Sequence, residues 1–257
     1  MSGERKLLLD VQGVGIDFGG LTAVQNLNLK VYEGEIVGLI GPNGAGKTTV
    51  FNMLTKVYQP SRGKIIFDGM DLEKKNIVET NRAGIARTFQ NIRLFSGLSV
   101  LDNVMTGYHN SITYSPFAAV LRTPAFRRQE RETEAKAKEL LKIMELDQVM
   151  NVTAGNLPYG AQRRLEIARA LATGPKLLLL DEPAAGMNPQ ETEELMRMIR
   201  LIRDSFGVSI LLIEHDMKLV MGICERITVL NYGMRLAQGT PEEIQANPEV
   251  IKAYLGD

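Results

Sequence analysis

The chain has 257 residues, enough for one large α/β domain or for a core domain with a subdomain. Its 30 Lys and Arg balance its 30 Asp and Glu, so no net field draws it to DNA, RNA or an anionic membrane surface. A single cysteine, Cys224, excludes an internal disulfide, and no apolar run approaches the ~18 residues of a membrane-spanning helix. These features predict a cytoplasmic protein that reaches a membrane only through a partner.

Three N-terminal segments carry strand patterns. Residues 27–31 alternate apolar and polar side chains, a period-two pattern typical of a half-buried strand. Residues 7–11 and 64–67 are two further short apolar segments, and an Asp-Gly turn closes the second of them. We predict that these segments form an antiparallel β layer.

A glycine-rich stretch follows the apolar strand expected at residues 35–40. It reads Gly41-Pro-Asn-Gly-Ala-Gly-Lys-Thr48, fits the phosphate-loop pattern G-x-x-x-x-G-K-[ST], and precedes a predicted helix at 47–54. In such a loop, backbone N–H groups and the helix start point at a polyphosphate. Lys47 is expected to reach the β- and γ-phosphates and Thr48 to hold Mg²⁺. The expected nucleotide contacts are Asn43, Gly44, Ala45, Gly46, Lys47, Thr48 and Thr49.

The middle of the chain, residues 95–156, has no buried-strand pattern. Residues 126–144 are charged and helical, with Glu132 and Glu134 each four positions before a lysine, and we interpret this as a solvated helix face. Residues 111–124 are predicted to form a long surface loop.

The apolar run Leu177–Leu180 ends in two adjacent acids, Asp181 and Glu182. A buried strand with acids at its end delivers them to the carboxyl edge of a parallel sheet, where open α/β folds bind ligands. Asp181 is expected to hold Mg²⁺, directly or through water. Glu182 is expected to act as general base toward the water that attacks the γ-phosphate.

The remaining elements complete a mostly parallel sheet covered by helices. A helical stripe over residues 195–206 ends at Gly207, and apolar runs follow at 209–213 and 226–230. Beyond the sheet, Thr-Pro at 240–241 and Asn-Pro at 247–248 are helix start signals.

The order of these motifs, together with Gln90, the stretch Leu157-Pro-Tyr-Gly-Ala-Gln-Arg-Arg164 and His215, resembles the ATP-binding cassette ATPases over nearly the whole chain. The resemblance implies ATP and Mg²⁺ as cofactors. It also implies an α/β fold with a P-loop (RecA-like), mostly parallel sheet core, an N-terminal antiparallel β layer and an α-helical subdomain. Within one cassette domain, 1–257, the core would comprise 1–94 and 157–240, the helical subdomain about 95–156, and a C-terminal helical tail 241–257.

The same resemblance gives roles to residues outside the phosphate loop. Gln90 corresponds to a glutamine that can ligand Mg²⁺ and contact the attacking water, and His215 to a histidine that contacts the γ-phosphate. Phe18 stands where relatives place an adenine-stacking aromatic ring, usually Tyr, and Val24 ends that nucleotide-contacting stretch. Asn188, where relatives usually have Asp, is expected to keep a polar contact across a dimer.

The stretch 157–162 departs from the common family signature LSGGQ, because Pro158 removes both a hydroxyl and an N–H. Anion binding at a helix start relies chiefly on the amides and the dipole, and the amides that follow Pro158 are intact. We therefore expect a working but altered clamp, with Gly160 its most sensitive residue. In the family this clamp closes over the ATP of a second subunit, which implies a homo- or heterodimer. Its expected nucleotide contacts are Pro158, Tyr159, Gly160 and Gln162.

Longer stretches, among them Arg87–Phe95, Tyr159–Arg169 and Ile213–Met221, resemble the LivG-type ATP-binding subunits of bacterial high-affinity branched-chain amino-acid importers. Relatives that serve urea or short-chain amides share most of these stretches. The resemblance implies transmembrane permease subunits as partners and, indirectly, a periplasmic or extracellular solute-binding protein. The implied location is the cytoplasmic face of the inner membrane.

Two other classes of protein carry a phosphate loop. Soluble cassette ATPases of DNA repair or translation usually have tandem cassettes, long coiled coils or a basic nucleic-acid face, and this sequence shows none of them, so no nucleic acid is expected. P-loop kinases and GTPases give no reason for Gln90 and His215 at these spacings, and the guanine-reading N-K-x-D is missing. We therefore expect an ATPase that powers a membrane importer.

Overall fold

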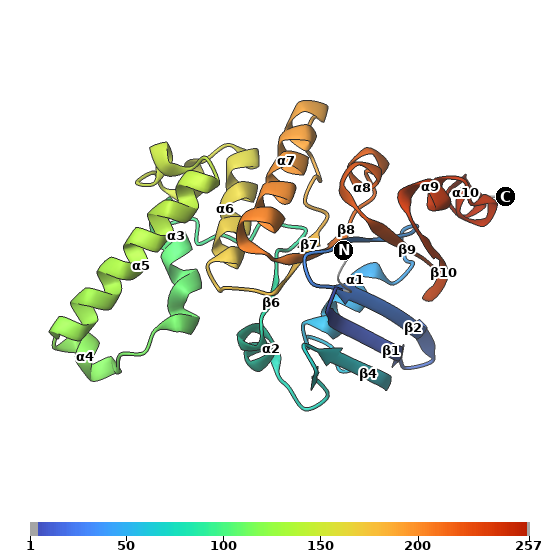
Figure 1. The fold of residues 1–257 in the computed structure, drawn as a ribbon, viewed down its shortest axis with the longest axis horizontal. Coiled ribbons are helices and arrows are strands. Elements are labelled where there is room, and N and C mark those ends of the chain that lie inside the picture. The colour runs from blue at the N-terminus through green and yellow to red at the C-terminus, as the bar shows by residue number, and fades with distance from the viewer. Residues whose placement is uncertain (1–4, 256–257) are drawn as a thin grey trace. The chain divides into compact units, whose positions relative to one another are not determined.

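Two compact units make up residues 5–255, the part of the chain that the computed structural model describes. The sheet unit comprises residues up to Gln90 together with Lys176 onward, and the helical unit comprises Asn91–Pro175. Figure 1 labels their helices and strands. The first four residues, and Gly256 and Asp257 at the end of the expected tail, lie outside the described residues.

The predicted antiparallel layer is confirmed. It has the strand order β2-β1-β4-β5, with bounds β1 (Leu7–Phe18), β2 (Leu21–Tyr32), β4 (Arg62–Phe67) and β5 (Met70–Asp71). Val11 of β1 lies opposite Leu29 on one side and Ile65 on the other. The strands extend beyond the predicted segments because β1 and β2 continue to a tight Gly19-Gly20 turn.

The second sheet has six strands in the order β10-β9-β3-β8-β7-β6. Its strands are β3 (Ile36–Ile40), β6 (Ile85–Arg87), β7 (Leu177–Asp181), β8 (Ser209–Ile213), β9 (Arg226–Asn231) and β10 (Met234–Gly239). All pairs are parallel except the one between β9 and the edge strand β10. Every residue of β3, β7 and β8 is buried, as expected for a sheet covered on both faces. The carboxyl ends of these parallel strands share one edge.

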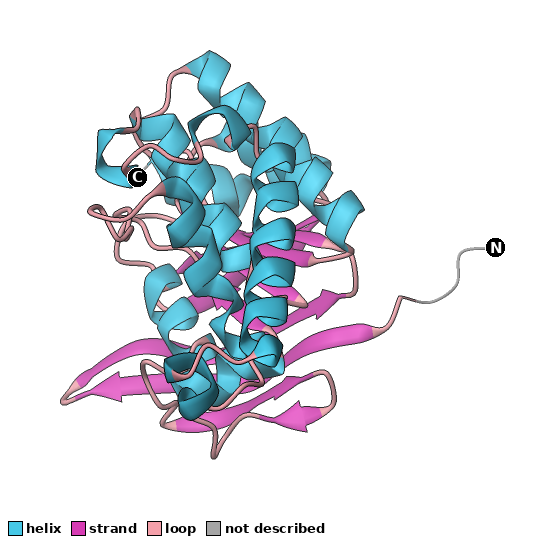
Figure 2. Ribbon diagram, turned by 90° about the vertical axis from the view of Figure 1, so that its left-hand side faces the viewer, coloured by secondary structure: helices cyan, strands magenta, loops and turns pink. Residues whose placement is uncertain are grey.

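Helix α1 (Lys47–Leu54) packs between the two sheets, which Figure 2 shows as separate magenta layers. Its Val50 and Phe51 share one apolar core with residues of both sheets. On α7 (Pro189–Phe206) the predicted stripe is buried at Leu195, Ile199 and Ile202, but its last member, Phe206, is 43% exposed. The helix ends at Gly207, which has a left-handed backbone conformation. The other helices of this unit are α2 (Ile77–Ala83), α8 (Met217–Ile223), α9 (Pro241–Gln245) and α10 (Pro248–Leu255).

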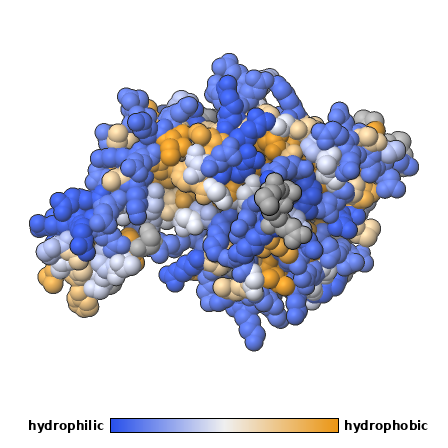
Figure 3. All heavy atoms as spheres, in the orientation of Figure 1, coloured by the Kyte–Doolittle hydropathy of each residue, from blue (hydrophilic) through white to orange (hydrophobic). Residues whose placement is uncertain are grey.

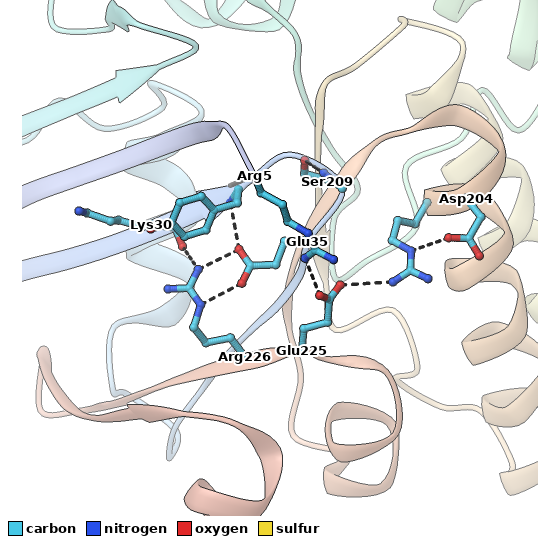
Figure 4. A network of polar contacts seen from close by, with 10 residues as sticks. Arg5, Lys30, Glu35, Asp204, Ser209, Glu225 and Arg226 are labelled. Carbon is cyan, nitrogen blue, oxygen red and sulfur yellow. Dashed lines mark hydrogen bonds and ion pairs between the residues drawn. The ribbon is translucent and has the colours of Figure 1, made fainter. Parts of the chain in front are cut away.

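A polar network joins the two sheets within the sheet unit (Figure 4). The Glu35 carboxylate, which is almost fully buried, accepts two hydrogen bonds from Arg226 of β9, at 2.9 and 2.8 Å. The same guanidinium donates to the Lys30 carbonyl oxygen of β2, at 2.8 Å, and lies over the Tyr32 ring. A bidentate pair of this kind fixes geometry as well as charge, so it helps to hold the two sheets in a defined position relative to each other.

The helical unit contains α3 (Val100–Gly107), α4 (Pro116–Val120), α5 (Pro124–Ile143) and α6 (Tyr159–Leu171). Helix α3 crosses α6 closely, because a Cβ on Gly107 would lie 2.4 Å from the Arg169 carbonyl oxygen. Of the two predicted lysine pairs on α5, the structure contains Glu134–Lys138, at 2.6 Å. Among residues 5–255, no helix has both the length and the hydropathy that crossing a membrane requires.

The prediction of a long surface loop at residues 111–124 is wrong in one respect, because the helix α4 lies within it. The Ser115 hydroxyl accepts a hydrogen bond from the Ala118 N–H, and Pro116 stands at the first turn. This is the same Ser/Thr-Pro start signal that was recognised at Thr240. The expected subdomain bounds, 95–156, stay a prediction. The compact helical unit spans Asn91–Pro175 and includes α6, which contacts α3 and α5.

Candidate active site at the phosphate loop

The loop between β3 and α1 has a shape that only glycine permits at two positions. Gly41 has φ +151°, and a Cβ there would lie 2.1 Å from the Leu230 carbonyl oxygen of β9. Gly46, with φ +98°, would place a Cβ 2.8 Å from the Ala23 carbonyl oxygen of β2. The loop is therefore pressed against β2 and β9.

Lys47 lies inside this loop. Its side chain is 8% exposed, and the ammonium donates to the Gly41 and Pro42 carbonyl oxygens at 2.7 and 3.0 Å. Burial lowers the pKa of the ammonium, while the nearby Glu182 and Asp181 carboxylates oppose that shift. The charge is thus held within the loop, where a bound polyphosphate would add negative charge close to the ammonium.

A cavity of about 540 Å³ opens beside the loop. Nine residues predicted to bind nucleotide, to ligand metal or to catalyse line it: Asn43, Gly44, Ala45, Gly46, Lys47, Thr48, Thr49, Gln90 and Glu182. The structure therefore brings the phosphate loop together with residues 90 and 182, which are distant in sequence. Five lining residues were not predicted: Leu21, Thr22, Ala23, Tyr232 and Gly233.

Glu182 lies between two other predicted catalytic residues. The Gln90 side-chain amide donates to Glu182 Oε2 at 2.8 Å, and His215 Nδ1 lies 3.7 Å from the same oxygen. The His215 side chain is 63% exposed and is not among the cavity-lining residues. The Glu182 backbone has φ +45°, which a non-glycine residue rarely adopts, and its N–H donates to the Ile213 carbonyl oxygen at 2.9 Å.

Asp181 does not line the cavity, and its carboxylate is paired with an arginine. Arg87 of β6 donates to Asp181 Oδ2 at 2.6 Å, and both side chains are almost fully buried. The same guanidinium donates to Asn52 at 2.7 Å and lies over the Phe51 and Phe89 rings. Arg87 belongs to the site although sequence reasoning gave it no role, because its partner lies 94 positions away.

Glu214 is a second residue of the site that the sequence did not indicate. Its fully buried carboxylate accepts hydrogen bonds from the backbone N–H groups of Ala184, His215 and Asp216, at 2.7, 2.9 and 3.2 Å. Burial raises the pKa of this carboxyl group, and the three N–H donors oppose the shift. Glu214 thereby ties the segment after Glu182 to the segment that carries His215.

Three residues of the sheet unit that were predicted to bind nucleotide lie outside the cavity lining. Phe18 is exposed and packs edge-to-face on Tyr58, with ring centroids 5.2 Å apart, and Val24 is fully buried beneath the loop. The Asn188 side-chain oxygen accepts from the N–H groups of residues 190 and 191 and caps α7. Tyr232, 86% exposed, is the aromatic ring that does line the cavity.

The signature stretch lies in the helical unit. Pro158 is the N-cap of α6, with φ −57°, and contributes no side-chain hydrogen bond to the helix start. Tyr159 and Gly160 begin the helix, and the Gln162 amide donates back to the Leu157 carbonyl oxygen at 2.8 Å. The first N–H groups of an α-helix have no acceptor within the helix, so α6 presents donors that no side chain of its N-cap covers.

The profile of the ABC transporter family matches residues 24–185, more than half of the chain. The chain belongs to the ABC transporter family. A second profile, described as branched-chain amino acid ATP-binding cassette transporter, matches residues 235–257. The chain is therefore an ATP-hydrolysing, nucleotide-binding subunit of a transporter, and the family predicted from the sequence is confirmed.

Known relatives resemble the chain over almost its full length. It is 51% identical to the high-affinity branched-chain amino acid transport ATP-binding protein LivG of Escherichia coli strain K12, over 97% of this chain and 98% of LivG. The ADP conformation of MJ1267, an ATP-binding cassette of an ABC transporter, superposes with a TM-score of 0.84 at 28% identity, covering 98% of this chain and 99% of that one. A dimeric post-hydrolysis state of the cassette MJ0796, bound to ADP and Pi, gives a TM-score of 0.76 at 25% identity, covering 91% and 99%. The predicted α/β cassette fold is confirmed.

Proposed function

We propose that this subunit hydrolyses ATP with Mg²⁺ in the 540 Å³ cavity and thereby powers an importer of branched-chain amino acids. The observation that carries the chemistry is the Gln90–Glu182 hydrogen bond beside the phosphate loop. It supports the proposal because a carboxylate, and an amide that can orient water, would then lie within reach of a γ-phosphate held on the loop. The solute assignment follows the name of the LivG relative and the C-terminal profile match.

Each cavity group has a task in this proposal. The loop amides and Lys47 bind the phosphates, Glu182 takes the proton of the attacking water, and Gln90 orients that water. Oxygen ligands suit Mg²⁺, and the Thr48 hydroxyl and Gln90 amide oxygen fit that need in the cavity. Bound Mg²⁺ would neutralise charge on the β- and γ-phosphates. Asp181, engaged by Arg87, would contact the ion through water, and His215 would contact the γ-phosphate.

The proposal includes a dimer of ATP-binding subunits. The uncapped start of α6, with Pro158, Tyr159, Gly160 and Gln162, would close over the ATP bound by a second subunit, homo- or heterologous. The dimeric MJ0796 cassette with ADP and Pi supports this arrangement. Phe18 would contact the nucleotide base, whereas Val24, which is fully buried, would support the loop from beneath instead of touching the nucleotide. Asn188 would lie at the dimer contact. Permease subunits would hold the dimer at the cytoplasmic face of the inner membrane, with an external binding protein delivering solute.

Reconstitution tests this function. The full chain, its permease subunits and its solute-binding protein are placed in proteoliposomes with ATP inside, and uptake of leucine, isoleucine and valine is compared with uptake of urea and acetamide. ATP-dependent uptake of the three amino acids alone is the expected result, with an assembly carrying Glu182→Gln as the inactive control. Uptake of urea or acetamide instead would show that the importer carries that solute and not branched-chain amino acids. Hydrolysis that nucleic acid stimulates, without permease binding, would refute transport.

A further inference from the structure

Three large apolar side chains are exposed together on the helical unit. Phe117, Val120 and Leu121 are 80%, 81% and 74% exposed. Their spacing of three and four residues puts them on one face of α4 and its C-cap. In Figure 3 a group of orange spheres marks the α4 end of α5. Single exposed apolar residues are ordinary, but a contiguous group at one tip indicates a contact surface.

The segment that carries this group is anchored to α5. The Tyr114 ring packs edge-to-face on Phe126, with centroids 5.0 Å apart, and its hydroxyl donates to Glu130 at 2.7 Å. The Thr113 N–H donates to the Gln129 side-chain oxygen at 3.3 Å. The apolar face is therefore held in place by the first turns of α5.

The surroundings of the apolar face are basic. Arg122, Arg127, Arg128 and Arg131 are all exposed, and within residues 5–255 none of these four guanidinium groups forms an ion pair. Residues 111–131 contain these four arginines, one glutamate and no other charged residue, so the local charge is +3. That glutamate, Glu130, is engaged by Tyr114. A chain with no net charge thus concentrates positive charge beside three of the most exposed large apolar side chains among its described residues.

We propose that this surface, the basic tip formed by the three apolar residues and the four arginines, docks directly on anionic lipid. Shallow insertion of apolar side chains, with arginines on the lipid phosphates, is the chemistry of interfacial membrane segments. A protein groove fits less well, because groove-binding helices present anchors over two or more turns and α4 has only one. Partner subunits were expected to supply all membrane contact, and the basic tip would add a direct contact with the bilayer.

Vesicle sedimentation tests the basic tip without permease, and its result is independent of hydrolysis and transport. The full chain is mixed with vesicles of phosphatidylcholine alone or of phosphatidylcholine with phosphatidylglycerol, at low and at high salt. We expect binding to the anionic vesicles only, and weaker binding at high salt because surface charges are screened. Equal binding to both vesicle types, or binding to neither, would overturn the proposal.

Matched variants separate the basic tip from general charge effects. Arg127→Gln with Arg128→Gln should weaken vesicle binding about 25-fold, since each surface cation contributes roughly a factor of five. Phe117→Ser with Leu121→Ser should weaken it at least about tenfold. Lys136→Gln with Lys142→Gln removes two exposed charges further along α5 and should change binding less than about twofold. Equal losses in the two charge variants would contradict a specific tip.

Two controls address folding and other partners. Circular dichroism and the ATPase rate of each variant should match those of the parent chain, because none of these side chains touches the cavity. Sedimentation velocity of the serine variant tests the rival that the tip pairs two copies of this chain. Loss of self-association, or of permease capture, with vesicle binding unchanged would refute lipid docking.

Discussion

The phosphate-loop edge of the sheet unit and the start of α6 in the helical unit differ in how their polar groups are satisfied. At the edge, Lys47 donates to loop carbonyls, Asp181 is paired with Arg87, and Glu214 accepts three backbone hydrogen bonds. At the start of α6, Pro158 supplies no side-chain acceptor. At the phosphate-loop edge, polar groups are paired with partners from the same chain. At the start of α6, backbone N–H donors are left for an acceptor from another molecule, as expected of a site shared between subunits.

The largest expected effect probes the internal order of the sheet unit. Arg87→Met leaves the buried Asp181 carboxylate without its cation and should lower the free energy of unfolding by about 3–5 kcal/mol. Arg163→Met, at the buried Arg163–Glu166 pair of the helical unit, should cost less, because Glu166 also accepts the Arg93 N–H at 3.1 Å. Urea denaturation of both variants measures the difference. Equal losses would remove the contrast between the two regions.

The second effect concerns chemistry at the loop edge. Glu182→Gln removes the proton acceptor but keeps the shape of the side chain, so turnover should fall by ~10² or more while ATP affinity is retained. Steady-state hydrolysis and nucleotide-binding titration report the two quantities. Glu132→Gln, an exposed site on α5, is the control. Unchanged turnover in Glu182→Gln would place the base elsewhere.

The third test addresses the start of α6. Gly160→Asp puts a negative charge beside donors proposed to meet a phosphate, and hydrolysis by the assembled dimer should fall at least about tenfold. ATP binding by the isolated variant should not change, because its own loop is untouched. Gly174→Asp adds the same charge beyond the other end of α6, where a Cβ meets open space and where Asp is one of the residues that tolerate the left-handed backbone, φ +69°. It should leave the rate near that of the parent. Full activity of Gly160→Asp would refute the shared clamp.

A smaller effect is expected at Asn188, which caps α7 in the structure and is also proposed to lie at the dimer contact. As the N-cap of α7 its loss in Asn188→Ala should cost about 1 kcal/mol of unfolding free energy. Asn188→Asp keeps the acceptor oxygen and should restore stability, as thermal denaturation will show. If Asn188→Ala is as stable as the parent yet weakens dimerisation, the dimer contact outweighs the cap.

The smallest effect is a pH dependence in the sheet unit. Asp68 accepts hydrogen bonds from Lys176 and Lys6, which lower its pKa to about 2. Because the folded pKa lies below the unfolded one, this contribution is present above roughly pH 3.9 and is lost as the pH falls through about 2. The parent and Asp68→Asn should therefore differ in the urea concentration at which half of the protein is unfolded, and this difference should shrink as the pH falls over that range. A gap that is constant with pH would contradict the assignment.

Local patterns predicted the elements that build the site. The buried strands, the phosphate loop and helix α7 depend on residues that are close in sequence, so periodicity and glycine spacing identified them. Arg87 and Glu214 escaped prediction because their roles depend on tertiary partners that no local pattern encodes. The helix α4 was missed although Ser115-Pro116 is a start signal, because five helical residues are too few to show periodicity.

The left-handed backbone at Glu182 has a consequence for protein engineering. Glycine or asparagine would relieve that conformation, so a library ranked by melting temperature alone should enrich them at this position. The selected variants would be more stable than the parent but would lack the proposed general base and hydrolyse ATP far more slowly. Thermostability screens on this subunit therefore need an activity counter-screen, and the position at which the two rankings disagree most should be 182.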